Sequence, residues 1–383
     1  MKEGWTYKKL VDECSILYGY PFDSKCFSTS PDDMPLIRIR DVKEGKTSTF
    51  YNGDYPKDYI IHKGDYLIGM DGEFNISPWQ SKDALLNQRV CKISCNTSSL
   101  LIRYVYRFLI KELKKIEDET PFVTVKHLSA KKINQINIPV PSIAEQEQIV
   151  AELDLLQGIS EKKKEQLKAY NQLAQSIFYT MFGDPVTNEK GWDVIQLGSK
   201  CEVSSFKRVL IEDVVDKGIP FIRGTELMSL SKGEKTPFTL FITPEHYEKV
   251  KAISGVPKIG DLLIPSINAN GSIWVLNTEE PRYYKDGRVL WVHVDNNTYT
   301  SQALKYIMHN LIMSNYSSVA SGATFAELKL FVLRELNTIQ PPLSLQQEFA
   351  EKVEAIERQK ALVQQSIDET QTMFDCTMDK YFG

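Results

Sequence analysis

Few residues of this chain stand at spacings that catalysis or metal binding requires. Gly45, Lys46 and Thr47 resemble the end of a phosphate-binding loop, but Arg40 stands where that motif begins with glycine. Residues 91 and 95 are cysteines without a second pair at the spacing of zinc ligands, and the five histidines are dispersed. The sequence therefore predicts neither a phosphate loop nor a metal site within the chain.

Two short patterns of charged residues could be parts of a nuclease site. They are Glu112 with Lys114 and Glu327 with Lys329. Both are expected on helices, where such charges are commonly part of the solvated surface. No Gly-x-Ser-x-Gly segment is present that would expose a nucleophilic serine at a strand-to-helix turn. A self-sufficient metal-dependent nuclease remains an alternative that lacks a recognisable site.

The composition predicts a globular protein of two or three domains. Of the 383 residues, 42% are hydrophobic and 25% are charged, and the net charge is −4; a domain usually holds roughly 100–200 residues. No stretch of about 18 apolar residues is present, and the first residues lack the apolar segment of a signal peptide. Because the six cysteines are scattered, we expect a reducing, cytoplasmic location and no membrane partner.

The sequence is internally duplicated. Five short landmarks recur in the same order, at offsets between 185 and 200 residues. Since loop insertions alone explain the changing offset, the chain is predicted to be two copies of one unit. The landmarks are Gly4-Trp5 with Gly191-Trp192, residues 35–38 with 220–223, residues 64–68 with 260–264, Pro141 and Gln146 with Pro341 and Gln346, and residues 181–183 with 381–383.

Each copy divides into a globule and a long helix. Short β-branched or aromatic runs bounded by turn residues predict strands, and amphipathic segments predict helices, so each globule is of mixed α/β type. Strands are expected near residues 35–39, 66–68, 262–264 and 289–294, and helices near residues 100–113 and 302–313. The expected boundaries are residues 1–140 for the first globule, 141–183 for the first long helix, 184–340 for the second globule and 341–383 for the second long helix.

The two long helices have matching starts and matching apolar stripes. Ser142 and Glu145 form a predicted capping box, and Ser344 and Gln347 are its expected counterpart. The apolar side chains recur in steps of three and four, with one polar gap, which is the heptad pattern of a two-helix seam. The seam residues are Ile149, Leu153, Leu156, Leu167 and Ile177 in the first helix and Phe349, Val353, Ile356, Val363 and Ile367 in the second.

Chain connectivity predicts how these helices pair. If the two stripes bury each other, the second helix must run back toward the first globule, so that Phe382 would end near Trp5. The predicted fold class is α+β: two similar mixed α/β domains, separated by an antiparallel two-helix coiled coil about 54 Å long, with pseudo-two-fold symmetry. Two separate globules with unrelated terminal helices are the alternative, which would expose the apolar stripes to water.

These features resemble the specificity subunit of Type I restriction–modification systems. The matching signature is a globule followed by Ile138-Pro139-Val140-Pro141 and then by Glu145-Gln146 at the start of a long helix. The second copy repeats the proline and the glutamine but carries Leu345 in place of the glutamate. Residues 181–192 resemble the junction into the second globule of that family, and residues 124–128 are another family-like segment.

The resemblance implies that each globule is a target recognition domain that recognises one half of a split double-stranded DNA sequence. The helices would set the distance between the halves and dock two methyltransferase subunits, and restriction (translocase) subunits would complete the complex. The chain itself would be non-catalytic and without a cofactor, because S-adenosylmethionine, ATP and Mg would be used by those partner subunits. The modest net charge fits this arrangement, since partners can hold the DNA backbone from the other side.

Candidate DNA contacts follow from the chemistry of base recognition, in which Arg or Lys suits guanine and Asn or Gln suits adenine. The candidates are polar residues at expected strand edges or loops, and for each the alternative is a solvated or structural role. Arg38 and Arg223 gain support because they occupy matched positions. The first-domain candidates are Arg38, Arg40, Lys82, Gln88, Arg89, Lys126 and His127, and those of the second domain are Arg223, Thr225, Ser266, Asn268, Asn270, Ser321 and Thr324.

Three other features are expected to have ordinary structural roles. Trp79 and Trp274 are expected in cores rather than stacked on bases. The basic run Lys162–Lys164 is expected on a solvated helix face, with contact to phosphate or to a partner subunit as the alternative.

The main alternative function is a stand-alone two-headed adaptor or regulator that uses the same domains to bind proteins.

Overall fold

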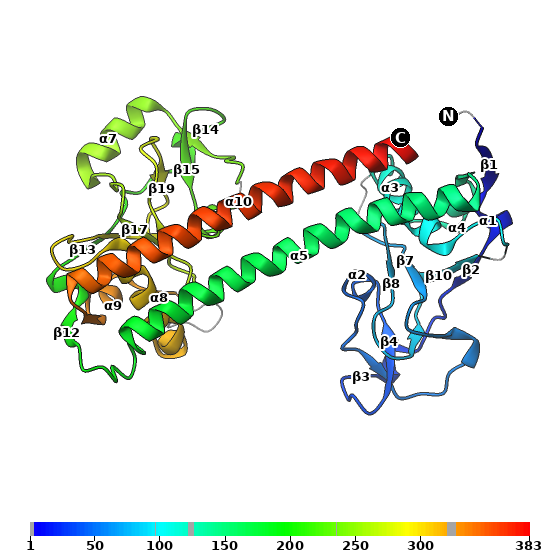
Figure 1. The fold of residues 1–383 in the computed structure, drawn as a ribbon, viewed down its shortest axis with the longest axis horizontal. Coiled ribbons are helices and arrows are strands. Elements are labelled where there is room, and N and C mark those ends of the chain that lie inside the picture. Colours follow the sequence, from blue (N-terminus) through cyan, green and yellow to red (C-terminus); the bar gives the residue numbers. More distant parts are fainter. Residues whose placement is uncertain (1–3, 96, 122–125, 235, 320–326) are drawn as a thin grey trace. The chain divides into compact units, whose positions relative to one another are not determined.

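The computed structural model describes residues 4–95, 97–121, 126–234, 236–319 and 327–383. The chain forms two compact units (Figure 1). Unit 1 consists of Met1–Lys163 with Ser366–Gly383, and unit 2 consists of Lys164–Gln365. Two helices of 40 residues, α5 (Ile143–Phe182) and α10 (Leu343–Phe382), each contribute residues to both units. Among the described residues, no helix combines the length and apolar character needed to cross a lipid bilayer.

Within its described residues, unit 1 contains a two-stranded sheet β1-β11, a four-stranded sheet β2-β10-β7-β8 and a five-stranded sheet β3-β5-β4-β9-β6. The strands β4 and β9 pair in parallel, whereas the sheet β2-β10-β7-β8 is antiparallel. The strands are β1 (Thr6–Lys9), β2 (Cys14–Tyr18), β3 (Phe27–Ser28), β4 (Met34–Ile37), β5 (Phe50–Tyr51), β6 (Ile60–Ile61), β7 (Tyr66–Gly69), β8 (Asn75–Pro78), β9 (Ala84–Leu86), β10 (Val90–Cys95) and β11 (Asn137–Val140); the helices are α1 (Leu10–Glu13), α2 (Asp41–Glu44), α3 (Ile102–Asp118) and α4 (Ala130–Asn134).

The described part of unit 2 repeats this plan with a two-stranded sheet β12-β21, a four-stranded sheet β13-β20-β17-β18 and a further sheet β14-β16-β15-β19. Here β15 and β19 form the parallel pair. The strands are β12 (Asp193–Gln196), β13 (Glu202–Ser205), β14 (Val214–Val215), β15 (Ile219–Ile222), β16 (Phe241–Ile242), β17 (Leu262–Pro265), β18 (Trp274–Val275), β19 (Tyr283–Tyr284), β20 (Val289–His293) and β21 (Asn337–Gln340); the helices are α6 (Gly224–Ser231), α7 (Pro244–Ser254), α8 (Ser301–Val319) and α9 (Leu330–Arg334).

The matching strand orders confirm two similar mixed α/β domains accompanied by long helices. The expected strands appear as β4, β7, β17 and β20, and the expected helices appear as α3 and α8. Both tryptophans expected in cores, Trp79 and Trp274, are buried. The parallel strand pairs β4–β9 and β15–β19 bring together strands that lie far apart in the sequence, which local patterns alone do not predict.

The main core of each unit lies where its four-stranded sheet meets its longest globular helix. In unit 1, α3 buries Tyr104, Val105, Phe108 and Leu109, which follow the spacing of one helical face. The same core includes apolar side chains of β7 and β10 and of both long helices, among them Ile68, Ile93, Ile149, Leu153 and Met378. In unit 2 the corresponding core is formed by α8, β17, β20 and both long helices.

The long helices begin differently despite their matched sequences. The capping box at the start of α5 is confirmed, because the backbone N–H of Glu145 donates to Ser142 Oγ (3.3 Å) and the backbone N–H of Ser142 donates to the Glu145 carboxylate (3.1 Å). The predicted counterpart at Ser344 is wrong. The helix α10 already begins at Leu343, so Pro342 occupies the cap position and Ser344 lies inside the first turn. A proline fits there, since its missing N–H needs no partner.

The contacts at the end of α5 explain why residues 181–192 carry a glycine, a lysine and a tryptophan at these positions. Gly183 adopts a positive φ of 75°, which lets its N–H bond back to the carbonyl of Tyr179 (2.9 Å) and closes the helix. Lys190 Nζ donates to the carbonyls of Thr180 (2.6 Å) and Met181 (3.0 Å), and Trp192 Nε1 donates to the carbonyl of Phe182 (2.8 Å). The positive charge of a lysine at this end also interacts favourably with the negative end of the helix dipole.

A buried glutamine attaches each long helix to its globule. Gln146 is fully buried; its Oε1 accepts from the N–H of Leu101 (2.9 Å), and its Nε2 donates to the carbonyls of Ser99 (2.7 Å) and Pro141 (3.0 Å). Since Leu101 precedes the first residue of α3, one side chain joins the starts of two helices. We call this arrangement the glutamine clamp.

Unit 2 contains the same clamp. The side chain of Gln346 accepts from the N–H of Thr300 (3.0 Å) and donates to the carbonyls of Thr298 (3.0 Å) and Pro341 (2.8 Å). Thr300 precedes α8 just as Leu101 precedes α3. The sequence singled out both glutamines as landmarks of the duplication without indicating their role.

The predicted seam residues occupy different environments. Ile149 and Leu153 belong to the core of unit 1, and Phe349 and Val353 belong to the core of unit 2. The remaining members of the second stripe and Leu156 are buried, whereas Leu167 and Ile177 are only half-buried. The fully buried Phe178 and Phe182 were not among the predicted seam residues. The mutual pairing of the two stripes along their length remains a prediction.

Within each unit, the start of one long helix lies against the end of the other. In unit 1, Tyr381 donates a hydrogen bond to Glu152 (2.8 Å), and both Trp5 and Phe382 pack on the same core. In unit 2, the rings of Phe178 and Phe182 lie 5.7 and 5.2 Å from that of Phe349. These contacts are what an antiparallel pairing of α5 and α10 requires at the two ends.

The clamp generates a stability prediction. Gln146→Leu or Gln346→Leu leaves one N–H and two carbonyls buried without their partner, so we expect each substitution to lower the free energy of unfolding by roughly 2–4 kcal/mol. Chemical denaturation of the full chain, followed by circular dichroism, measures the change. The exposed neighbours provide the controls, since Gln148→Leu and Gln347→Leu should change it by less than about 0.5 kcal/mol. Equal effects of clamp and control variants would contradict this role.

Candidate nucleic-acid interface

Both four-stranded sheets place an arginine at the same topological position. The pairing of β7 with β10 ends at Gly69 and Val90, and that of β17 with β20 ends at Pro265 and Val289. Arg89 and Arg288 each immediately precede the second strand of their pair. The carbonyl of Arg89 accepts from the N–H of Met70 (2.9 Å), and that of Arg288 accepts from the N–H of Ser266 (3.0 Å).

The segment before α4 or α9 completes each arrangement. The N–H of Leu128 donates to the carbonyl of Met70, and that of Leu328 donates to the carbonyl of Ser266, both at 2.7 Å. Three stretches that are distant in sequence therefore meet at one edge of each sheet. We call these places the Arg89 corner (Asp71, Arg89 and His127) and the Arg288 corner (Ser266, Arg288 and Glu327).

In the Arg89 corner, a carboxylate lies between two basic side chains. Asp71 Oδ2 is 3.6 Å from Arg89 Nε, and Asp71 Oδ1 is hydrogen-bonded to His127 Nδ1. Arg89 Nη1 also lies 3.3 Å from His127 Nδ1. The arginine side chain is 55% exposed, and its backbone has a φ of 72°, which is uncommon for a residue with a side chain. The turn before β10 thus presents an accessible guanidinium at the sheet edge.

The Arg288 corner also pairs an arginine with a carboxylate, but the second group on the carboxylate is a serine instead of a histidine. Arg288 Nη1 lies 3.1 Å from Glu327 Oε1, and the same oxygen accepts a hydrogen bond from Ser266 Oγ (3.3 Å). The arginine side chain is 49% exposed. Exposed ion pairs of this kind contribute only about 0–1 kcal/mol to stability, so stability does not explain why both corners have one.

The sequence identified only part of these corners. Arg89, His127 and Ser266 were predicted contacts, whereas Asp71 and Arg288 were not considered. Glu327 was considered only as part of a nuclease pattern on a helix, and that placement is wrong: Glu327 forms an isolated bridge with Ile267 before α9 begins. Glu112 does lie on a helix, α3. The detectable signal for Arg288 was its offset of 199 residues from Arg89, within the range of the duplication.

The matched arginines Arg38 and Arg223 follow the equivalent strands β4 and β15. In both cases an acid three residues later accepts from the arginine N–H, at 2.8 Å from Asp41 and 3.2 Å from Glu226. At α6 this bond forms part of a capping box, whereas at α2 the acid Asp41 is itself the first helical residue.

The side chains of the two arginines differ in their engagement. Arg38 is exposed, whereas Arg223 is half-buried and donates to Glu226 from Nε (2.9 Å) and Nη2. That bond raises the pKa of Arg223. Burial favours a higher pKa for Glu226, but the bonds from Arg223 and Thr225 outweigh it and lower the pKa. Both Arg223 and the predicted contact Thr225 thus already serve the cap of α6.

The remaining first-domain candidates lie on the surface or in structural bonds. Arg40 and Gln88 are exposed, and Arg40 lies 3.7 Å from Asp41. Lys82 is exposed, and its carbonyl accepts from Trp79 Nε1 (2.7 Å). Lys126 donates to the carbonyl of Glu117 (2.6 Å) near the end of α3. None of these positions tests the predicted contact with DNA.

The second-domain candidates are divided by burial. Ser266 and Asn268 are buried, and Asn268 closes a turn by accepting from the N–H of Ser272 (2.6 Å) and donating to its carbonyl (2.9 Å). Asn270 is exposed on that turn. The candidates Ser321 and Thr324, and Thr124 and Val125 of the family-like segment, lie outside the described residues.

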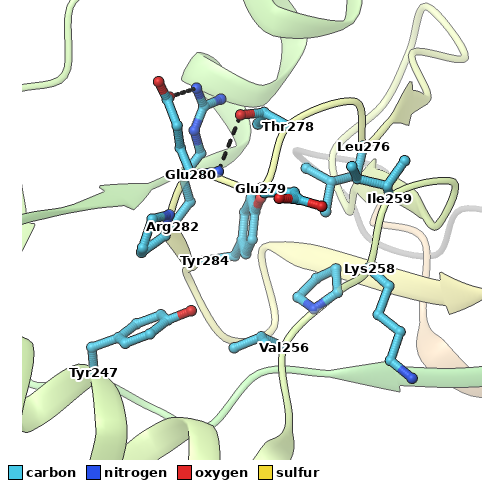
Figure 2. Close-up of a pocket in the computed structure, with 12 residues that line it drawn as sticks. Tyr247, Val256, Lys258, Ile259, Leu276, Thr278, Glu279, Glu280, Arg282 and Tyr284 are labelled. Carbon is cyan, nitrogen blue, oxygen red and sulfur yellow. Dashed lines mark hydrogen bonds and ion pairs between the residues drawn. The ribbon is translucent and has the colours of Figure 1, made fainter.

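Unit 2 also contains a pocket of about 410 Å³ beside α7 (Figure 2). Arg282 lies over the rings of Phe238 and Trp274, at 5.4 and 5.6 Å, and donates to Glu280 (2.8 Å). Burial raises the pKa of Tyr284, which lines the pocket. In the described residues of unit 1, no helix corresponds to α7. The pocket therefore combines Tyr247 of α7 with residues of segments that both domains share, such as Tyr284 of β19.

Comparison with known proteins confirms the resemblance predicted from the sequence. Residues 2–169 match the family model described as the Type I restriction modification DNA specificity domain. The EcoBI specificity subunit of a Type I restriction enzyme from Escherichia coli is 35% identical over 212 residues, 55% of this chain and 45% of that protein. The chain thus aligns with less than half the length of that relative.

Longer but weaker similarities extend over most of the chain. A putative Type I restriction enzyme specificity subunit from Haemophilus influenzae is 24% identical, over 78% of this chain and 77% of that protein. Two solved structures share the fold. The S subunit from M. genitalium matches 99% of this chain and 96% of its own, with a TM-score of 0.52 and 14% identity. A chain from a study of Type I R-M complex assembly matches 100% and 98%, with a TM-score of 0.54 and 18% identity.

Proposed function

We propose that this chain, whose sequence and fold resemble Type I specificity subunits, is the non-catalytic DNA-recognition subunit of such a restriction–modification complex. Each globular domain recognises one half of a bipartite double-stranded DNA target. The observation that carries the proposal is the duplicated domain with an exposed arginine at the same sheet edge in both copies, in a chain that matches a DNA specificity domain over residues 2–169.

The two corners supply the chemistry that base recognition needs. A guanidinium can donate two parallel hydrogen bonds to the O6 and N7 atoms of guanine, or bind a backbone phosphate. The chain carries a net charge of −4, so its affinity for DNA must come from such local groups and from partners. Arg38, Arg40, Gln88 and Asn270 are exposed and remain candidate contacts.

The long helices are proposed to separate the half-sites and to dock the methyltransferase subunits. An antiparallel pairing of α5 and α10 is supported by the contacts between opposite helix ends in each unit. Both helices are continuous over 40 residues, and α5 continues through Gly158. A continuous helix transmits a fixed spacing better than a loop does.

Catalysis and its cofactors are proposed to belong to the partners. S-adenosylmethionine would serve adenine methylation in two methyltransferase subunits, and ATP with Mg would serve translocation and cleavage in restriction subunits. The role of this chain's own residues is to bind and orient the DNA. The isolated chain should therefore neither methylate nor cleave DNA.

Exchanging one domain tests the proposed function directly. Replacing residues 1–140 by the corresponding domain of another specificity subunit should change one half of the methylated motif and leave the other half intact. Adenine methylation mapped across a genome, with the chain expressed beside its methyltransferase, measures this. An unchanged motif after the exchange would contradict the proposal.

The two arginines should each affect their own half-site. We expect Arg89→Ala and Arg288→Ala to weaken binding of the assembled complex to its target by about 1–3 kcal/mol, because a bidentate contact to guanine contributes that much. Binding to targets altered in one half or the other assigns each arginine to its half-site. Lys43→Ala and Lys251→Ala remove an exposed cation elsewhere in the same domains and serve as controls. Loss no greater than in the controls would exclude the corners as contacts.

Exposed apolar residues on the long helices are candidates for docking partner subunits. Leu173 and Met373 occupy matched positions and are 46% and 59% exposed. We expect Leu173→Glu and Met373→Glu each to remove one methyltransferase subunit from the complex, because a buried unpaired carboxylate is costly at an interface. Native mass spectrometry measures the stoichiometry. Gln172→Glu and Thr372→Glu, at the neighbouring exposed positions, should retain both subunits, and full assembly of every variant would argue against docking here.

A further inference from the structure

Both corners hold a carboxylate against the arginine, but the carboxylate comes from a different segment in each. Asp71 follows β7, whereas Glu327 lies in the segment before α9. The same β-bridge is present in both domains: Asp71 pairs with His127 in unit 1, and Ile267 pairs with Glu327 in unit 2. The acid therefore stands on one strand of this bridge in unit 1 and on the opposite strand in unit 2. Its contact with the arginine is present in both units.

Each carboxylate is also held by a second group. His127 bonds to Asp71, and Ser266 donates to Glu327. This support keeps the acid next to the arginine instead of leaving it free in solvent. Neither pair is buried enough to stabilise the domain appreciably, as both arginines are about half exposed. The recurrence of the pair therefore requires an explanation other than folding.

The physical effect of such an acid on DNA binding is twofold. Its negative charge repels the phosphate backbone, which carries the sequence-independent part of the affinity. Its hydrogen bond restrains the guanidinium and so limits the orientations from which the arginine can reach a base edge or a phosphate. An acid at this position therefore weakens phosphate contacts, which need no fixed orientation, more than it weakens a base contact of defined geometry.

We propose that Asp71 and Glu327 are specificity-determining residues, which restrain Arg89 and Arg288 and suppress binding to non-target DNA. The inference rests on the proposed function and extends it. The acids act through the arginines and are positioning residues. Neutralising an acid frees its arginine for phosphates anywhere on the duplex, whereas on the target it removes both a repulsion and a useful restraint.

The experiment compares target and non-target duplexes in the assembled complex. Asp71→Asn and Glu327→Gln should each raise the affinity for non-target DNA roughly three- to ten-fold and make its salt dependence steeper by about one ion, as expected for one added phosphate contact. The affinity for the target should stay the same or fall, so that the ratio of the two decreases. The methylated motif should become less strict only in the half-site that the altered domain recognises.

The controls separate this effect from a general change of charge or of folding. Asp83→Asn and Glu248→Gln remove an acid from an exposed ion pair in the same domains that includes no corner residue, and should leave the ratio unchanged. Asp71→Glu and Glu327→Asp keep the negative charge and should preserve most of the ratio of target to non-target affinity. Thermal unfolding of each complex excludes a loss of structure.

Failure of the inference can be distinguished from failure of the proposed function. If the unaltered complex shows no preference for any target, the proposed function is wrong. If the unaltered complex is selective and both neutral variants keep its ratio and salt dependence, the proposed role of the acids alone is wrong. A similar fall in the ratio for the corner and control variants would also overturn it, since total charge would then be responsible.

Discussion

The glutamine clamp is the interaction on which the rest of the architecture depends. A side-chain amide with one acceptor and two donated hydrogen bonds fills the space where two helices and a proline-rich strand end meet, in unit 1 and again in unit 2. Both glutamines are inaccessible to solvent, where any missing bond would carry the full cost of burying a polar group. A flexible or apolar residue could fill the volume but could not fix the direction in which the long helix leaves its globule.

The clamp also explains why the starts of α5 and α10 tolerate different caps. At α5, Ser142 and Glu145 supply reciprocal hydrogen bonds, whereas α10 begins after Pro342 without that box. The helix start is held in both cases from inside the globule, by the buried amide one turn into the helix. The exposed cap residues are therefore free to differ, because they add to an orientation that the clamp has already determined.

Much of the fold could be predicted from the sequence because the duplication doubles every signal. The strands β7 and β17 and the helices α3 and α8 were predictable, since each has a short apolar run or an amphipathic face and a counterpart in the other copy. The capping box at Ser344 was wrongly predicted, because a serine two residues later matches the preferred N-cap residues and Pro342 does not. The seam prediction omitted Phe178 and Phe182, whose burial comes from the globule of unit 2, which no helical period reveals.

The corners were harder to predict, for a definable reason. Arg89 and Arg288 are equivalent, and comparing the copies residue by residue would have found them. The acids are not equivalent in sequence: Asp71 and Glu327 stand on opposite strands of one bridge, and only their positions in space show that they do the same thing. The parallel pairing of β4 with β9 and of β15 with β19, which sets where the following turns lie, is likewise invisible to local patterns.

Different acids form the same ion pair with the arginine in the two domains, which supports a role for the arrangement itself. If the acids only balanced a nearby positive charge, any exposed position around the arginine would serve, and neither would need a second hydrogen bond. Instead, each acid has an additional partner from a neighbouring segment, His127 in one domain and Ser266 in the other. The domains also differ in other segments, since α7 in unit 2 has no counterpart among the described helices of unit 1. Under the proposed function, the two domains recognise different sequences through variable surroundings and keep a restrained arginine at the same sheet edge.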